Sequence, residues 1–111
     1  MNDIEITRLC AEAMGLTPYC IQGILQECGG GGIYVVSKTD TRGYRVYDPR
    51  NDKAQAMELV IALQLSVGYS AGWGCVKNDD RGMILSGAFH FDDLLRAICT
   101  CVSGLRMKGE R

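Results

Sequence analysis

The sequence has little of what marks several specialised classes of protein. It contains two prolines and one histidine in 111 residues, and its formal net charge is −1. Its basic residues are scattered, whereas nonspecific nucleic-acid binders are expected to carry a basic excess. No apolar run reaches the ~18 residues that a membrane-spanning helix needs. The first residues, MNDIEITRL, are acidic and polar, unlike a secretory signal. We therefore expect a cytoplasmic protein that binds neither nucleic acid nor a membrane.

The six cysteines form neither a metal-binding pattern nor a disulfide framework. They include no Cys-x-x-Cys pair, and His90 is not close to any of them in sequence. A chain of this length buries roughly two-thirds of its unfolded surface, which is enough for a core without disulfides. Cys99 and Cys101 are two apart in a predicted helix and therefore point to different faces. The sequence predicts free, mostly buried cysteines, with no metal and no cofactor.

Residues 47–65 carry the strongest structural signal in the chain. Pro49 ends the strand before them, and either Asn51 or Asp52 can cap the helix that follows. Apolar residues then recur at helical spacing: Ala54, Met57, Val60, Ile61 and Leu65. Further apolar positions widen this stripe until little of the helix is polar: Leu59, Ala62 and Leu63. Such a helix is usually covered on more than one side, and we expect a sheet on one side and a second subunit on the other.

Two other helices are predicted, one at each end of the chain. The first begins after Asn2 or Asp3, and Gly15 is suited to close it in a left-handed conformation. Its expected buried stripe is Ile6, Leu9, Cys10, Ala13 and Met14. The last helix follows the capping pair Asp92-Asp93. Its expected buried stripe is Leu94, Leu95, Ile98, Cys101, Val102 and Leu105.

The remaining segments favour strands and turns. Residues 33–36 and 44–47 predict a hairpin, and residues 66–71, 72–77 and 83–86 predict further strands. Residues 16–28 fit either a short helix or an irregular strand pair. The fold class is therefore α+β: one domain, residues 1–111, in which an antiparallel sheet and packed helices form a small sandwich in the order helix, hairpin, helix, strands, helix.

Four consecutive glycines, residues 29–32, raise the alternative of a phosphate-binding loop. That loop requires a lysine and a hydroxyl residue directly afterwards, followed by a helix. Here the next residues, Ile33–Val36, predict a strand. The pattern favours a flexible loop.

Three short motifs resemble the small phage proteins of the phage ABA-sandwich domain family. They are AEAMG at residues 11–15, YDP with NDKAQAMELV at residues 47–60, and LLRAICTCVSGL at residues 94–105. Residues 16–32 and 66–90 carry no matching motif, and Leu16 stands where the family often has tryptophan. Part of this family consists of Thoeris anti-defence sponges of the first type. The resemblance implies a homo-oligomer, a dimer or hexamer, in the host-cell cytoplasm that sequesters cyclic ADP-ribose isomers, or cyclic oligonucleotides, without cleaving them.

A sponge for such signals needs flat rings to stack on a base and cations to bind phosphate. The expected ligand-binding residues, which supply these groups and a carboxamide, are Tyr69, Trp73, Phe89, Arg45, Arg50, Arg96 and Asn78. Gly72 and Gly74 would let a ligand approach the backbone beside Trp73. Each also has a plain structural interpretation: Tyr69 and Phe89 as core aromatics, residues 78–80 as a turn, and Arg96 as a solvated helix residue. The resemblance favours Arg96, because it places ligand-contacting arginines late in the chain.

Two enzyme interpretations compete with binding. His90 with Asp92 or Asp93 could transfer protons, with Cys75 as a nucleophile. Asp79 and Asp80 could hold Mg²⁺, although adjacent carboxylates in an extended segment point to opposite faces and no third carboxylate supports them. The sequence favours a non-catalytic binder. The alternative from another class is a phage accessory protein that binds a host protein through the apolar face of the helix in residues 53–65.

Overall fold

The computed structural model describes residues 2–108. Within this range the helices are α1 (Asp3–Ala13), α2 (Lys53–Leu63) and α3 (Leu94–Met107). The strands are β1 (Cys20–Ile21), β2 (Ile24–Leu25), β3 (Glu27–Gly29), β4 (Gly32–Val36), β5 (Tyr44–Tyr47), β6 (Ser66–Tyr69), β7 (Trp73–Asn78) and β8 (Ile84–Phe91). Of the two alternatives for residues 16–28, the irregular strand pair is the one present. The last strand continues beyond the predicted residue 86 to Phe91.

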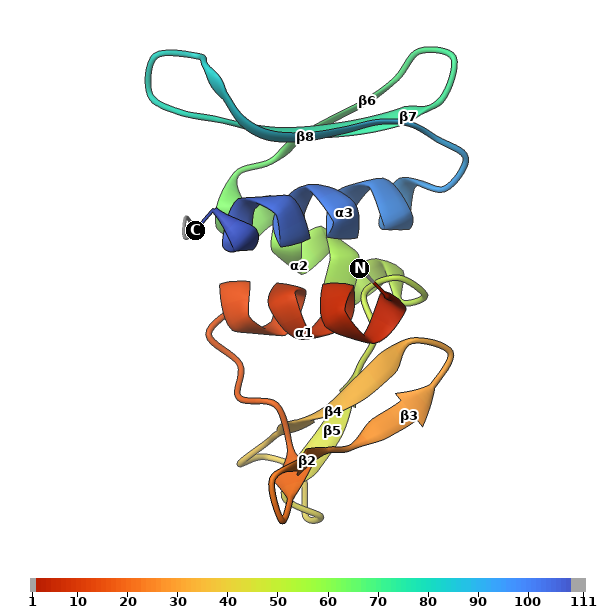
Figure 1. Cartoon of the computed structure of the whole chain (residues 1–111), viewed down its shortest axis with the longest axis vertical. Coiled ribbons are helices and arrows are strands. Elements are labelled where there is room, and N and C mark those ends of the chain that lie inside the picture. The colour runs from red at the N-terminus through yellow and green to blue at the C-terminus, as the bar shows by residue number, and fades with distance from the viewer. Residues whose placement is uncertain (1, 109–111) are drawn as a thin grey trace.

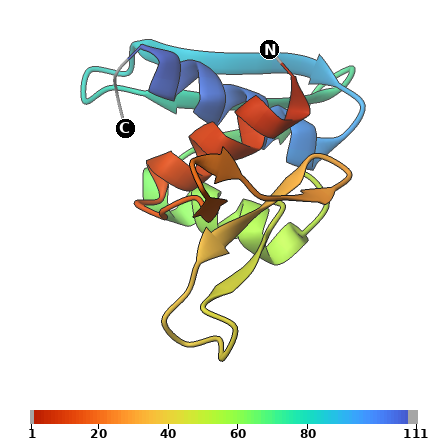
Figure 2. The same cartoon turned by 60° about the horizontal axis from the view of Figure 1, so that its bottom comes forward.

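The helices form a layer between two sheets (Figure 1). One sheet, of order β3-β4-β5, packs against α1 and is called the N-terminal sheet below. The other, of order β6-β7-β8, packs against α3 and is called the C-terminal sheet. Figure 2 shows the same layers from another side, with the β4–β5 connection projecting away from the helices.

The predicted α+β class and the antiparallel pairing are confirmed. The single sheet that the sequence predicted is instead divided. The strands described form the N-terminal sheet, the C-terminal sheet and a two-stranded β1–β2 pair. The helical layer lies between the strands that precede α2 and those that follow it, so these two groups cannot pair with each other.

Each helix begins at a side-chain cap, as the sequence predicted. Asn2 Oδ1 accepts a hydrogen bond from the Glu5 amide at 2.8 Å, Asp52 Oδ1 one from Gln55 at 3.1 Å, and Asp93 Oδ1 one from Leu95 at 2.8 Å. Each cap satisfies an N–H group that has no partner inside its helix and contributes about 1 kcal/mol. Gly15 follows α1 with φ 73°, the predicted left-handed closure.

Helix α3 is the centre of the core because it is covered on two sides. The Cys10 thiol of α1 contacts the Cys99 carbonyl at 3.7 Å, while Ser86 Oγ of β8 donates to the Cys101 carbonyl at 2.8 Å. Cys99 and Cys101 therefore face different elements, as their spacing predicted, and both are fully buried. All six cysteines are free, and four of them are buried.

The predicted buried stripe of α2 is wrong in part. The structure buries Ala56, Leu59 and Leu63, whereas Ile61 is 77% exposed and Met57 36% exposed. The helix packs mainly against α3 rather than against a sheet. Because α2 is apolar around most of its circumference, periodicity alone does not specify a buried face, and the position of α3 decides it.

The buried stripe of α1 also differs from the prediction. Thr7 and Ala11 are fully buried with Cys10 and Ala13, whereas Ile6, Leu9 and Met14 are only half-buried. Small side chains allow α1 to lie close to α3 and β4, so the contact face holds fewer large residues than the hydrophobic pattern suggested. In the described range, no helix combines the length and apolarity that crossing a membrane would require.

Candidate ligand-binding site

A hollow of about 610 Å³ lies where α2 and α3 begin. Its lining residues come from the loop before α2, the first turns of both helices and the start of β7: Arg50, Asn51, Lys53, Met57, Trp73, Asp93, Leu94 and Leu95. One part of the lining is aromatic and aliphatic, and the other carries two cations. This combination suits a ligand with a flat ring and negative charge.

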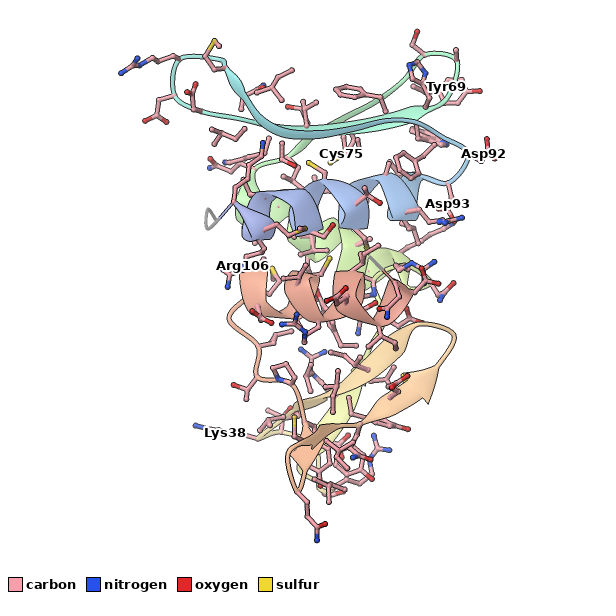
Figure 3. All side chains as sticks on the ribbon, in the orientation of Figure 1. Lys38, Tyr69, Cys75, Asp92, Asp93 and Arg106 are labelled. Atoms are coloured by element: carbon pink, nitrogen blue, oxygen red, sulfur yellow. The ribbon has the colours of Figure 1, made fainter. Side chains whose placement is uncertain are left out.

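The aromatic part is Trp73, the first residue of β7. The Trp73 ring meets the edge of the Tyr69 ring with centroids 5.2 Å apart and planes at 69°. Tyr69 is 68% exposed and lies at the same end of the C-terminal sheet as Asp93 (Figure 3). Trp73 is half-buried and packs against the core, so its position is held by neighbours on one side while the hollow lies on another.

Gly72, beside Trp73, has a structural role that differs from the one expected. A Cβ at Gly72 would lie 2.8 Å from His90 Cα, and the residue has φ 138°. The close approach is therefore between two strands of the sheet. Gly74 likewise faces the Phe89 ring, which a Cβ at this position would meet at 3.5 Å. Gly72 therefore allows the β6–β7 turn to lie close to β8, whereas the Gly74 contact is of ordinary length, and both glycines line the second hollow described below.

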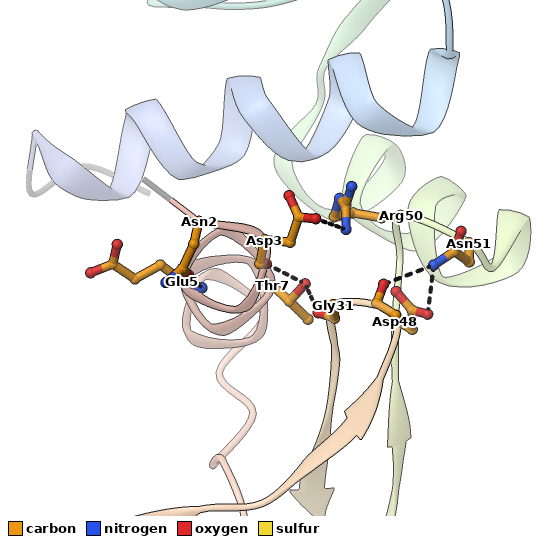
Figure 4. A network of polar contacts seen from close by, with 9 residues as sticks. Asn2, Asp3, Glu5, Thr7, Gly31, Asp48, Arg50 and Asn51 are labelled. Atoms are coloured by element: carbon orange, nitrogen blue, oxygen red, sulfur yellow. Dashed lines mark hydrogen bonds and ion pairs between the residues drawn. The ribbon is translucent and has the colours of Figure 1, made fainter.

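Arg50 supplies the more buried cation of the hollow and is ion-paired (Figure 4). Its Nη1 lies 3.2 Å from Asp3 Oδ2, and its side chain is 13% exposed. The guanidinium also lies against Gly31, where any Cβ would collide with it. Thr7 Oγ1 donates to the Gly31 carbonyl at 2.7 Å and ties this turn to α1. The β3–β4 turn and α1 together hold Arg50 in place.

This arrangement explains part of the glycine run. Gly31 must be small because Arg50 occupies the adjacent space, and Gly32 because a Cβ would lie 2.7 Å from Cys28 Sγ and 3.0 Å from Asp48 Cβ. The predicted loop is a tight turn between β3 and β4. Its glycines serve close packing and positive φ.

Cations and carboxylates both surround the hollow. Among the described residues of its lining, Arg50 and Lys53 stand against a single carboxylate, Asp93. Both α2 and α3 begin there, and the start of a helix carries a partial positive charge. Asp93 already accepts the Leu95 amide, and Asp3, outside the lining, partly neutralises Arg50. Lys53 is exposed and able to reach a bound ligand.

The structure brings together some of the residues expected to bind a ligand and separates others. Trp73 and Arg50 line the same hollow, and Tyr69 touches Trp73 but itself lines the second, smaller hollow. The other expected residues lie elsewhere: Asn78 at the opposite end of β7, Phe89 beside the smaller hollow of the same sheet, Arg45 in the N-terminal sheet, and Arg96 exposed on α3 outside the lining.

Sequence reasoning missed Lys53, Met57 and the Asp3–Arg50 pair. Lys53 directly follows the capping residue of α2, and this position at the start of the helix is the sequence signal that could have identified it. Leu94 and Leu95 were expected in the core, and they do border it while also lining the hollow. No local pattern connects Asp3 with Arg50, because α1 and the β5–α2 loop meet only in the folded chain.

A second hollow, of about 400 Å³, lies on the C-terminal sheet and includes Gly68, Gly74 and Phe89 in its lining. The described residues that line it include no Asp, Glu, Lys or Arg. Phe89 lies over Gly87, where a Cβ would be 2.7 Å from the ring. This hollow offers contact area but no charged partner for a phosphate.

Two of the groups considered for catalysis, Cys75 and Asp79, are engaged in structural contacts. Cys75 is 1% exposed, and a hydrogen bond with Cys101 together with burial raises the pKa of its thiol. Asp79 Oδ1 accepts the amides of Arg81 and Met83, each at 2.8 Å, which confirms the predicted turn. Within residues 2–108, no three His, Cys, Asp or Glu side chains gather where they could hold a metal ion.

No protein-family model, curated protein sequence or solved structure matches this chain.

Proposed function

We propose that this protein binds a small anionic ligand bearing a planar base, of the cyclic ADP-ribose or cyclic oligonucleotide type, in the hollow between α2, α3 and Trp73. The observation that carries the proposal is the meeting of Trp73, Arg50 and Lys53 in one lining. Trp73 would stack on the base, which is worth about 1–3 kcal/mol. Arg50 and Lys53 would bind phosphate through charge-assisted hydrogen bonds.

The proposed action is sequestration without chemical change. The nucleophile that the sequence offered, Cys75, is buried, and its thiol pKa is raised. The Asp93 carboxylate caps α3, and that of Asp79 organises a turn. These contacts support binding without chemical change.

The biological setting of the proposal rests on the resemblance to the phage ABA-sandwich domain family. On that basis we propose a phage-encoded anti-defence sponge that acts in the host-cell cytoplasm as a homo-oligomer. Its target would be a signal made by bacterial TIR enzymes in Thoeris defence. The geometry of the hollow supports the chemical class of ligand, and the resemblance supports the role.

Ligand release after denaturation tests the proposal directly. The purified protein is incubated with a TIR-derived cyclic ADP-ribose isomer and a panel of cyclic oligonucleotides, separated from free ligand and then heat-denatured. Recovery of intact ligand is expected. Recovery of an altered nucleotide would indicate an enzyme, and retention of no nucleotide would reject binding altogether.

A matched pair of variants tests the location. Lys53→Ala removes an exposed cation from the lining, and Arg96→Ala removes an exposed cation outside it. Loss of one charge-assisted hydrogen bond should weaken binding in Lys53→Ala about tenfold or more, as measured by calorimetry. Arg96→Ala should bind as the unchanged protein does. The opposite ranking would place the ligand elsewhere on the molecule.

An alternative function is binding of a host protein through α2. The observation in its favour is the exposed apolar surface of α2, with Ile61 77% exposed and Met57 36% exposed. A protein with this function would retain no nucleotide in the release experiment. It would also form a complex with a host partner that Lys53→Ala leaves intact.

A further inference from the structure

The second hollow lies on the face of the C-terminal sheet that points away from α3. Cys75 and its partner across the strands, Ala88, are buried against the core. Because successive strand residues point to opposite faces, Gly74 points outward, and so does Gly68, which pairs with it. Figure 1 shows α3 on one side of this sheet and, among the described residues, no helix or strand on the other. The floor of the second hollow is therefore sheet backbone that faces solvent.

Gly68 lies inside β6, although the fold does not require glycine there. A Cβ at Gly68 would meet no atom within 4 Å beyond its two chain neighbours, and its φ is not positive. By contrast, a Cβ at Gly72 would lie 2.8 Å from His90 Cα, and one at Gly87 would lie 2.7 Å from the Phe89 ring. Glycine inside a strand weakens it and often marks the close approach of a ligand or another backbone. The space over Gly68 is open to such a ligand.

A bulge in β8 brings two consecutive side chains to this hollow. The β7–β8 register shifts beside Gly74, which lies opposite both Phe89 and His90. Neighbouring strand residues normally point to opposite faces, yet Phe89 and His90 both line the hollow. His90 has φ 63°, a left-handed conformation that histidine adopts more often than most residues. Bulges are frequent next to active sites, where they re-aim a side chain. This bulge places an aromatic ring and an imidazole beside the open glycine floor.

The composition of the lining specifies the kind of ligand that fits. Among the described residues it includes no Asp, Glu, Lys or Arg, so a phosphate or carboxylate would lose hydration without gaining a cation. Its polar side chains are Ser66, Tyr69, Ser70 and His90, which can donate to or accept from the edge of a ring. The Phe89 ring, 53% exposed, offers a surface for aromatic contact. A volume of about 400 Å³ lies in the range of small-molecule sites.

We propose that the second hollow binds an uncharged planar ring with polar edges, the chemistry of a nucleoside or a free nucleobase. The ring lies over Gly68 and against Phe89, and His90 forms a hydrogen bond with its edge. Trp73 alternates with Gly74 along β7 and packs against the core, so the hollow that it lines is on the opposite face of the sheet. The second site is therefore separate from the anionic site proposed above and does not depend on it.

An NMR titration of the whole chain with adenosine is the first test. Adenosine should shift the amide signals of residues 66–69 and 87–90. Inorganic phosphate, as the charged probe, should leave the same signals unchanged. Adenosine shifts confined to residues 50–57 would place the nucleoside in the hollow at the start of α2 and reject a second site. Phosphate-dependent shifts at residues 66–69 would overturn the uncharged class of ligand.

Two variants test the contacts within the second hollow. Gly68→Thr places a side chain in the open space, where threonine favours the strand, so it should abolish the adenosine shifts without loss of stability to urea. Phe89→Leu removes the aromatic surface and should weaken adenosine binding about fivefold or more. Val46→Thr is the control, because Val46 is 44% exposed on a strand of the other sheet, and it should bind adenosine unchanged. Full affinity for adenosine in either Gly68→Thr or Phe89→Leu would overturn the proposal.

Discussion

The two three-stranded sheets cover opposite sides of the helical layer with different side chains. The N-terminal sheet contributes large residues to the core, among them Ile33, Val35 and Tyr47, each at most 1% exposed. The buried residues of the C-terminal sheet are small: Cys75, Ser86 and Ala88. One sheet thus fills space with side chains, and the other brings its backbone close to α3. Of the two sheets, the N-terminal sheet therefore contributes the larger buried side chains to the core that surrounds α3.

On their solvent-facing surfaces, the two sheets differ in how far their aromatic side chains contact one another. Around the N-terminal sheet, Tyr19 stacks on Tyr44 with centroids 4.6 Å apart, Tyr34 meets the same ring at 5.1 Å, and Arg42 lies 5.0 Å above it. These side chains contact one another. The C-terminal sheet instead has Phe89 over glycines, the exposed Tyr69 and the open β6 edge. The C-terminal sheet, which buries the smaller side chains, therefore has the larger number of exposed groups that a ligand or partner could contact.

The largest expected effect comes from truncating the core side of each sheet. Ile33→Ala should lower the free energy of unfolding by about 2–5 kcal/mol, because it leaves a cavity beneath the N-terminal sheet. Cys75→Ala, under the C-terminal sheet, removes a single sulfur atom and should cost roughly 1–2 kcal/mol. Urea denaturation measures both. Equal losses of unfolding free energy in the two variants would contradict the proposed difference between the two sheets.

The pH dependence of stability should also separate them. Burial raises the pKa of Tyr47 in the N-terminal sheet, and hydrogen bonding with burial raises that of Cys75 in the C-terminal sheet. The folded protein then keeps protons that the unfolded chain loses, so stability is full below the unfolded pKa and falls as pH rises above it. The decline should begin near pH 8.5 for the thiol and steepen near pH 10 for the phenol.

Each such group costs about 1.4 kcal/mol per pH unit above its unfolded pKa. Thermal unfolding measured from neutral to alkaline pH provides the curve. Cys75→Ala should flatten part of the first decline, because the buried Cys10 thiol, whose pKa is also raised by its hydrogen bond with Cys99 and by burial, contributes the rest, and it should leave the decline above pH 10 in place. A curve that is unchanged in Cys75→Ala would mean that this thiol ionises equally in both states.

The smallest effect concerns the turn that holds Arg50. Gly30 and Gly31 both have positive φ, but only Gly31 faces the Arg50 guanidinium. Gly30→Ala should cost about 1 kcal/mol through its left-handed backbone alone. Gly31→Ala should cost more and also weaken nucleotide binding, because Arg50 is displaced. Denaturation measures the stability of the two variants, and calorimetry measures their nucleotide binding. Equal binding by both variants would show that Arg50 does not contribute to the binding site.

Much of the fold could be predicted because its signals are local. The hairpin at residues 33–47, the turn after Asn78 and the three helices follow from turn residues and apolar periodicity. The division into two sheets could not be predicted, because it depends on where the helical layer lies. Of the expected site residues, Trp73 and Arg50 line one hollow. Chemical type alone does not specify the face on which a side chain lies, so the others could not be placed from the sequence.

The sequence by itself determined where each helix begins and how α1 closes. The caps at Asn2, Asp52 and Asp93 and the closure at Gly15 depend on hydrogen bonds and backbone angles within a few residues. Tertiary structure alone decided that α2 buries Leu59 and exposes Ile61, and that Asp3 meets Arg50 beside the glycine turn. Those outcomes depend on which elements pack against one another. Because α2 is apolar on most sides, its packing partners decide which of its residues are buried.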